Sequence, residues 1–497
     1  MGALSARGYW LGRLVFQRSL AATYLVAFLV ALNQFRPLIG SSGILPVPRF
    51  LAAVPFRRSP SIFHLHYSDR FFAALAAVGV VVALTALVGL SDAGAAWVSM
   101  LAWGALWALY LSIVNVGQVW YGFGWESLLL ETGFLAVFLG PAGTAPPTIV
   151  LWMFRWLLFR LEFGAGLIKL RGDPCWRDLT CLHHHHETQP LPNPLSWFFH
   201  HLPGPVHKLE VIGNHVAQLV APVLLFAPQP VARGAALVMI VTQLWLVLSG
   251  NFSWLNVVTI AVAVTAVDDS LLGQLLPVSR PHHLHTPAAW QEGLVYAVAA
   301  LVVVLSWRPA RNLLSRRQVM NFSFDRLHLV NTYGAFGRVT KVRHEVVVEG
   351  TSDELVTRTT EWKEYHFKAK PGDPRRRPPQ VAPYHLRLDW MMWFAALSRA
   401  QADRWFVPFV ARLLENDRAT LKLLRSNPFP DAPPRFVRAR FYRYRFTDRH
   451  QRRETGAWWT RSLVGDYLPP VALDGLDGVA TRGGVATRGG AQTRGRR

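Results

Sequence analysis

Three charged residues stand at equal spacing inside one apolar segment. Arg155, Glu162 and Lys169 are seven residues apart in the run FRWLLFRLEFGAGLIKL. At roughly 100° per residue they share one face of a helix. A charge near the bilayer centre costs about 2.5 to 3.5 kcal/mol, so this face is expected to look into a protein bundle or a water-filled cavity. The three residues are the catalytic candidates, and an ion-pair network that fixes the helix is the alternative interpretation.

A second apolar run, YGFGWESLLLETGFLAVFLGP at residues 121–141, carries two carboxylates. We expect Glu126 and Glu131 to pair with the positive charges at Arg155 and Lys169, because a carboxylate partner makes a buried cation tolerable. Both glutamates are therefore expected to be structural.

A dense polar segment, RGDPCWRDLTC, follows the charged helix directly. Its cysteines, Cys175 and Cys181, are the only two in the chain, and their spacing permits a disulfide that closes a small loop. Free buried thiols and thiol exchange are the alternatives, although the spacing is not that of a CxxC redox motif. Nearby prolines and arginine–carboxylate bonds predict a rigid loop. The other structural candidates in it are Asp173, Trp176, Arg177 and Asp178.

A run of histidines continues this segment, with Glu187 directly after it and further histidines at 200, 201, 207 and 215. Imidazole is a common metal ligand, but consecutive histidines point in different directions and no HExxH pattern occurs. We therefore predict an exposed loop surface and no metal. The weak metal candidates are His183, His184, His185 and His186.

The composition indicates a membrane protein with an attached soluble part. Of 497 residues, 51% are hydrophobic, 20 are Trp, and the formal net charge is +22. Arginine and lysine gather at the N-terminus, in the first loop and in the C-terminal third, so anionic lipid headgroups are the expected partner rather than nucleic acid. No nucleotide loop, GxSxG elbow or zinc-protease motif occurs.

The predicted fold is a polytopic α-helical membrane bundle followed by a β-rich C-terminal domain with a few helices. Residues 1–18 form a basic N-terminus that lacks the apolar core of a signal peptide, and residues 19–307 form the transmembrane domain, with a loop at 171–210. We expect about nine spans, within one or two. The predicted spans are 20–32, 71–90, 96–119, 128–139, 149–170, 211–226, 231–248, 254–267 and 288–307.

Beyond residue 307 the apolar pattern changes to period two, in HEVVVEG, EWKEYHFKAK and RFVRARFYRYRF, which predicts strands in a domain at 318–468. Helical periodicity interrupts it at 388–400 and 404–416. The tail at 469–497 repeats VATRGG and is expected to be disordered.

Three segments carry a family resemblance. RLEFGAGLIKLRGDPCWRDLTC with HETQPLPNPLSWFFHHLP, the run at 121–141, and the region from FSFDRLHLVNTYGAFGRVTKVRHEVVVEGT to NPFPDAPPRFVRARFYRYRF resemble the lipase maturation factor family. Where the C-terminal resemblance is close, a surface for a protein client is one interpretation and packing is the other. The client-binding candidates are Asp325, Arg326, Asn331, Tyr333, Trp362, Asp389 and Trp390.

The resemblance implies a membrane-embedded factor that assists folding or assembly of secreted lipases or other exported proteins, rather than an enzyme. The membrane would be that of the endoplasmic reticulum in a eukaryote and the plasma membrane in a bacterium. No cofactor is predicted. A more distant resemblance to vitamin K-dependent carboxylases keeps a membrane enzyme, with Lys169 as its base, as the alternative. A transporter is a further alternative, although no inverted repeat is visible.

Overall fold

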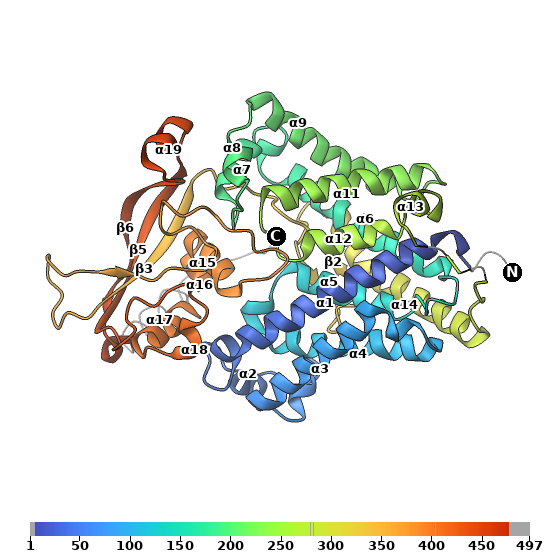
Figure 1. Cartoon of the computed structure of the whole chain (residues 1–497), viewed down its shortest axis with the longest axis horizontal. Coiled ribbons are helices and arrows are strands. Elements are labelled where there is room, and N and C mark those ends of the chain that lie inside the picture. The colour runs from blue at the N-terminus through green and yellow to red at the C-terminus, as the bar shows by residue number, and fades with distance from the viewer. Residues whose placement is uncertain (1–4, 279, 282, 403, 477–497) are drawn as a thin grey trace, which may run out of the picture.

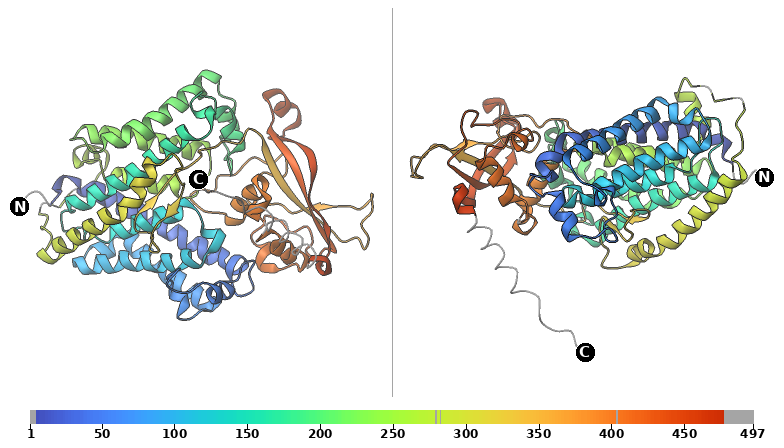
Figure 2. Two further views of the ribbon diagram at one scale, coloured as in Figure 1. Left: turned by 180° about the vertical axis from the view of Figure 1, so that it is seen from behind. Right: turned by 90° about the horizontal axis from the view of Figure 1, so that it is seen from below.

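The computed structural model describes residues 5–278, 280–281, 283–402 and 404–476. A bundle of helices runs from α1 to α14, and a region with an antiparallel sheet follows at one end of it (Figure 1). In Figure 2, α1 begins at the end of the bundle that lies away from the sheet. The bundle and the sheet therefore follow each other along the longest axis of the molecule.

Five helices are long and apolar enough to cross a membrane. A bent pair, α12 (Leu255–Val264) with α13 (Asp269–Leu275), would make a sixth span. Within the described residues this supports five or six spans, and the expected nine are not confirmed. The five helices are α1 (Trp10–Ile39), α3 (Asp69–Val88), α4 (Ala96–Val116), α11 (Val231–Ser249) and α14 (Ala289–Leu314).

The remaining bundle helices fail this test for different reasons. The 24 residues of α6 (Thr148–Arg171) give a length of about 36 Å, but the helix carries several charges. The 13 residues of α5 (Gly124–Ala136) give only about 20 Å, against a hydrocarbon thickness of about 30 Å. A π-helical turn, η7 (Val216–Val220), separates α9 (Gly204–His215) from α10 (Ala221–Leu224).

The first helix begins earlier than the charge pattern predicts. Because α1 starts at Trp10, the expected boundary at residue 18 is wrong, and the span predicted at 20–32 is its middle. Arg13 donates to the carbonyl oxygens of Pro141 and Ala142, and Arg18 pairs with Asp92 at 2.6 Å. These partners let the helix continue through both arginines. The loop that follows contains a short helix, α2 (Val47–Ala53).

The predicted loop at 171–210, hereafter the signature segment, is largely helical. Several of its side chains are buried, including Trp176 and Trp197. It contains η6 (Pro174–Trp176), α7 (Leu182–Thr188), α8 (Ser196–His200) and the first half of α9.

The C-terminal region holds a four-stranded antiparallel sheet in the order β4-β3-β5-β6. The strands are β4 (Lys363–Glu364), β3 (Arg343–Thr351), β5 (Phe436–Phe446) and β6 (Trp459–Val471). Val346 on β3 pairs with Phe441 on β5, in register with their period-two patterns. A further two-stranded ladder joins β1 (Phe322–Ser323) to β2 (Asn331–Thr332).

Helices cover the sheet beside the bundle. They are α15 (Arg387–Leu397), α16 (Arg399–Ala402), α17 (Phe406–Leu414) and α18 (Arg418–Leu421). The helix α19 (Arg449–Thr455) instead connects β5 to β6 and has no buried residues (Figure 1). The two predicted helical segments correspond to α15 and α17. The sequence missed β6, whose last residues reach into the predicted tail at 469–497, so its boundary at 469 is wrong. Positions 477–497 lie outside the described residues.

A cavity between the bundle and the C-terminal region

A cavity of about 500 Å³ lies where the bundle meets the C-terminal region. Aromatic side chains from α5, η6 and α15 form much of its wall, and polar side chains from α6, α9 and α11 gather on another part of it. A largely apolar cavity with a few convergent polar groups is the usual form of a binding site. Residues that line the cavity include Phe123, Trp125, Glu162, Lys169, Trp176, His185, His186, Glu210, Asn214, Gln218, Gln243, Tyr333, Trp390 and Trp393.

Glu162 and Lys169 belong to one buried hydrogen-bond network. Lys169 Nζ donates to Asn214 Oδ1 at 2.9 Å and to Gln218 Oε1 at 2.8 Å. Gln218 in turn donates to Glu162 Oε2 at 3.0 Å, and Gln243 donates to Glu162 Oε1 at 2.7 Å. The two charged groups are therefore bridged by amides and do not touch directly.

The π-helical turn places Gln218 in this network. A π turn widens the backbone by one residue and re-aims the side chains that follow. Gly166 on α6 allows the close approach, because a Cβ there would stand 2.7 Å from Leu219 Cδ2 and 3.0 Å from the Gln218 carbonyl oxygen. The sequence signal for this contact is the GAG triplet inside the charged helix.

The surroundings of Lys169 favour a structural cation. Its ammonium lies 4.8 Å from the centre of the Trp176 ring, in addition to the two amide oxygens. Oxygen acceptors and an aromatic face both stabilise a positive charge.

Arg155 is not brought to this cluster, since it lies about 21 Å away along α6. It donates instead to the Leu225 carbonyl oxygen and to the Tyr9 hydroxyl.

The expected pairing of Glu126 and Glu131 with Arg155 and Lys169 is wrong. Glu126 pairs with Arg387 on α15, 2.8 Å from Oε1 to Nη1. Tyr110 also donates to this carboxylate. The reason is geometric, because the face of α6 that carries Arg155 and Lys169 looks toward α9 and α10, not toward α5.

Glu131 takes its partner from the other face of α6. Arg160, which the sequence analysis did not single out, forms a buried ion pair with it and also donates to the Asn331 carbonyl oxygen. The Asn331 amide and the Tyr333 hydroxyl donate to Glu131 Oε2 at 2.9 and 2.7 Å. This carboxylate therefore joins α5, α6 and the β2 segment.

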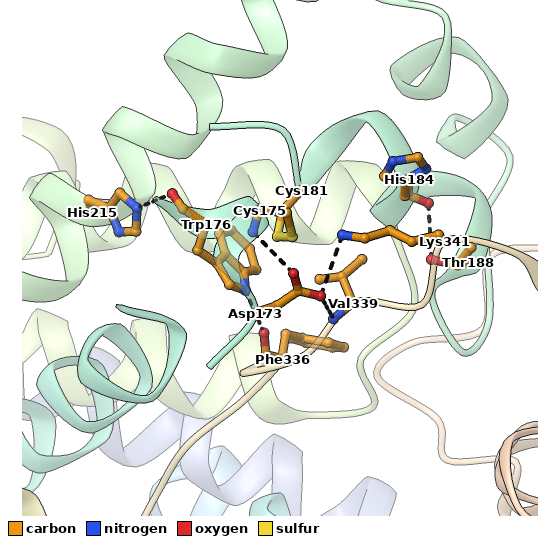
Figure 3. Close-up of a disulfide and its surroundings, with 10 residues drawn as sticks. All are labelled: Asp173, Cys175, Trp176, Cys181, His184, Thr188, His215, Phe336, Val339 and Lys341. Atoms are coloured by element: carbon orange, nitrogen blue, oxygen red, sulfur yellow. Dashed lines mark hydrogen bonds and ion pairs between the residues drawn. A yellow bond between two sulfur atoms is a disulfide. The ribbon is translucent and has the colours of Figure 1, made fainter. Parts of the chain in front are cut away.

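The structure joins Cys175 and Cys181 in a disulfide with Cα atoms 4.8 Å apart (Figure 3). Beside it, Asp173 accepts from the Cys175 amide and lies 3.4 Å from Lys341 Nζ. Burial opposes the charged form of Asp173, but hydrogen bonds from the Cys175 and Val339 amides and the nearby Lys341 lower its pKa. Trp176 donates through Nε1 to the Phe336 carbonyl oxygen.

The predicted arginine–carboxylate links inside this loop are wrong. Asp173 pairs with Lys341 across to the C-terminal region, while Arg177 and Asp178 are exposed. In the described part of the chain, no ion pair joins Arg177 to either aspartate. Rigidity comes from the disulfide and from contacts with residues 336–341 instead.

The signature segment is tied to the sheet by Arg343. This side chain on β3 donates to the carbonyl oxygens of Glu187, Gln189 and Pro190 and pairs with Glu345 at 2.6 Å. Such contacts satisfy backbone acceptors at a turn that has no ladder of its own. The signature segment and the C-terminal region thus meet at one end of the bundle.

The prediction that the histidine run is an exposed surface is wrong for two members. His185 and His186 are 6% and 2% exposed, whereas His183 and His184 are half-buried. Burial lowers the pKa of His185 to about 3, with the neighbouring His186 adding to the effect. α7 places alternate members of the run against different neighbours, so His185 contacts Phe336 and His186 faces α9.

The client-binding candidates divide by burial. Asn331, Tyr333, Asp389 and Trp390 are buried, and of these Tyr333 and Trp390 line the cavity. Asp389 accepts from the Ala369 and Lys370 amides and so caps a turn.

The other three candidates lie elsewhere. Asp325 accepts amide hydrogens from Leu327 and Leu329, which closes the turn before β2. Arg326 is exposed, and the Trp362 ring stacks under the Arg438 guanidinium at 3.9 Å. The structure therefore does not gather the seven candidates into one surface.

The helices and the cavity define a multi-pass membrane protein whose C-terminal region is built on an antiparallel sheet. Two family models match the chain: the lipase maturation factor transmembrane domain at residues 11–274 and the lipase maturation factor C-terminal domain at residues 329–469. The chain belongs to the lipase maturation factor family. No solved structure gave a significant match.

Curated relatives align over nearly the whole chain. Lipase maturation factor 1 of Bos taurus is 42% identical over 522 residues, which cover 96% of this chain and 92% of the relative. Lipase maturation factor 1 of Homo sapiens is 43% identical, covering 94% of this chain and 89% of the relative. Lipase maturation factor 2 of Homo sapiens is more distant, at 31% identity with 94% and 83% covered. These matches confirm the resemblance and do not favour the carboxylase or transporter alternatives.

Proposed function

We propose that this protein is a membrane-embedded maturation factor that assists the folding or assembly of secreted lipases. The observation that carries the proposal is the alignment with relatives named for lipase maturation through both the bundle and the C-terminal region. The matched segments lie in both parts of the chain, at residues 11–274 and 329–469. The membrane is that of the endoplasmic reticulum if the source is a eukaryote.

More helices of the bundle cross the membrane than the five long apolar ones. We expect α6 to be a further span, because it is long enough and its charges, apart from the terminal Arg171, are buried and paired or hydrogen-bonded. Intramembrane charges are tolerated when they face a bundle interior. With α5 and the α9–α10 unit as partial spans, the total approaches nine. Cysteine accessibility mapping across both ends of each helix tests this count.

The test of function is secretion of an active lipase. The full chain is co-expressed with a secreted lipase in cells that lack their own maturation factor, and lipase activity per lipase molecule is measured in the medium. A several-fold rise in specific activity supports the proposal. An unchanged specific activity, with the protein correctly inserted in the membrane, contradicts it.

The cavity is the proposed place of client contact. It carries the buried candidates Tyr333 and Trp390, and an apolar wall suits an exposed apolar segment of an incompletely folded client. Ala165 on α6 lines it and is 6% exposed, so Ala165→Phe fills part of the space. Ala77 on α3 is exposed, and Ala77→Phe adds the same ring outside the cavity.

We expect Ala165→Phe to lower lipase maturation at least fivefold while Ala77→Phe keeps it. Insertion and detergent stability of both variants are measured beside the secretion assay. Equal maturation by the two variants would place client contact outside the cavity without affecting the family function.

A further inference from the structure

A buried cluster of two imidazoles and one carboxylate lies between α7 and α9. His207 and Glu210 are three residues apart on α9, which puts them on one face of that helix. His186 reaches the same point from α7. The sequence signal is the HKLE tetrad, a His-x-x-Glu pair on a helix, which the analysis of the histidine run did not single out.

The three side chains converge at short range. His207 Nδ1 lies 2.8 Å from Glu210 Oε2, and His186 Nε2 lies 3.6 Å from Glu210 Oε1. One ligand atom from each residue can be chosen so that all lie within 4.8 Å of one another. The Glu210 side chain is 6% exposed, and His186 and His207 are 2% and 1% exposed.

His186 has an ion-pair partner at this point, Glu210, but makes no hydrogen bond to it, because the two atoms are 3.6 Å apart. Neither Nδ1 nor Nε2 has a hydrogen-bond partner among the described residues, although the ring is buried. A buried polar atom without a partner carries a desolvation cost, and native proteins rarely leave one. Because Nε2 is the His186 atom nearest Glu210, the ring nitrogen that lacks a hydrogen bond points into the cluster.

Two outer contacts orient the other ligands. Trp245 Nε1 donates to Glu210 Oε1 at 2.7 Å, and His207 Nε2 lies 3.4 Å from the His200 carbonyl oxygen. An imidazole that gives one nitrogen to a metal commonly donates its other N–H to a carbonyl or carboxylate. The second nitrogen of His207 is placed for that arrangement.

We propose that His186, His207 and Glu210 bind one divalent metal ion of the zinc class. Two imidazole nitrogens and a carboxylate oxygen are a common zinc set, with bonds of about 2.0 to 2.2 Å. Ligand atoms then stand about 3.3 Å apart, so His186 closes toward its partners by up to about 1.5 Å. This changes the expectation of no metal, and His183, His184 and His185 take no part.

The fourth coordination position faces the cavity. His186 and Glu210 both line that space, and the described residues supply three ligands to the cluster. A zinc site with three protein ligands leaves a position for water or for a donor atom of a bound molecule. The ion also joins α7 to α9 and so fixes the signature segment over the cavity.

The test measures metal content of the full chain. The protein is purified in detergent through a tag without histidine, equilibrated with Zn²⁺, freed of excess by gel filtration and analysed by plasma mass spectrometry. We expect about one zinc per chain, and visible absorption typical of four-coordinate cobalt when Co²⁺ replaces it. Wild-type protein with less than a tenth of an equivalent overturns the proposal.

Variants separate ligands from bystanders. Glu210→Gln and His207→Ala are expected to lower zinc content at least tenfold, whereas His450→Ala on α19, 82% exposed, leaves it unchanged. If a variant does not fold, wild-type protein decides alone: chelation should lower the melting temperature and Zn²⁺, but not Mg²⁺, should restore it. Full zinc content in folded Glu210→Gln, or a melting temperature indifferent to chelation and Zn²⁺, contradicts the site.

Discussion

Glu126 on α5 and Arg387 on α15 are 261 positions apart in the chain and 2.8 Å apart between Oε1 and Nη1. Both side chains are fully buried. The guanidinium also donates to the Trp120 carbonyl oxygen at 2.6 Å and lies 3.4 Å from the centre of the Tyr121 ring. This ion pair is therefore one of the contacts that hold the C-terminal region to the bundle.

Breaking this pair from one side should destabilise the whole molecule. Arg387→Met leaves the Glu126 carboxylate buried without its cation, at an expected loss of about 3 to 5 kcal/mol. Thermal unfolding in detergent measures it. The control is Arg435→Met, because Arg435 and Glu354 form an exposed pair at 3.8 Å. The double variant Glu126→Gln with Arg387→Met should recover part of the loss, and additive losses would contradict the coupling.

The disulfide between Cys175 and Cys181 should stabilise the signature segment. The cysteines are six positions apart, and closing such a loop is worth about 2 kcal/mol in the chain-entropy account. Replacing both by Ser should lower the melting temperature by the equivalent amount. Since the chain has no other cysteine, mass analysis after alkylation without reductant should find no labelled thiol, and two labels would refute the pairing.

Substitution of Lys169 distinguishes a structural cation from a catalytic base. Lys169→Arg keeps the positive charge near Asn214, Gln218 and the Trp176 ring, but a guanidinium does not lose its proton and cannot act as a base. We expect this variant to insert stably and to retain lipase maturation. A stable but inactive Lys169→Arg protein would instead favour a membrane enzyme.

Lys169→Met is the companion variant. It leaves the Gln218 amide oxygen, which is buried, and the Asn214 amide oxygen, which is partly buried, without this donor, and it removes a cation near Glu162, with an expected cost of about 3 kcal/mol. We therefore expect loss of maturation together with loss of stability, measured by thermal unfolding in the same detergent. Loss of activity at full stability would point to a role beyond structure.

His385 should make the stability of the protein fall in acid. Burial, with the adjacent Arg387 charge, lowers its pKa from 6.5 to about 4 in the folded protein, despite the nearby Glu126. The unfolded chain takes up the proton first as pH falls, so stability from this group is full above pH 6.5 and is lost between 6.5 and 4. The loss approaches about 3 kcal/mol.

The measurement for His385 is a difference between two proteins. His385→Gln keeps a planar polar group near Trp125, whose Nε1 lies 3.4 Å from His385 Nδ1, and removes the titration. Melting temperatures from pH 7 to pH 4 should fall less steeply for the variant. Parallel curves would show that His385 does not titrate differently in the two states.

The sequence by itself determined what depends on local pattern. Apolar runs marked the long helices, period-two runs marked β3 and β5, and the spacing of two cysteines allowed the observed disulfide. The segments around Glu162, Cys175 and Tyr333 were enough to place the chain in its family. Each of these signals is contained within a few turns of helix or a single strand.

Only the tertiary structure decided which side chains meet. Glu131 pairs with Arg160 and not with Arg155, Asp173 pairs with Lys341 and not with Arg177, and His186 pairs with Glu210 on another helix. The partner of a charged side chain depends on which face of its helix carries it and on which segment packs against that face. Those contacts join residues 24 to 168 positions apart, and no local spacing encodes them.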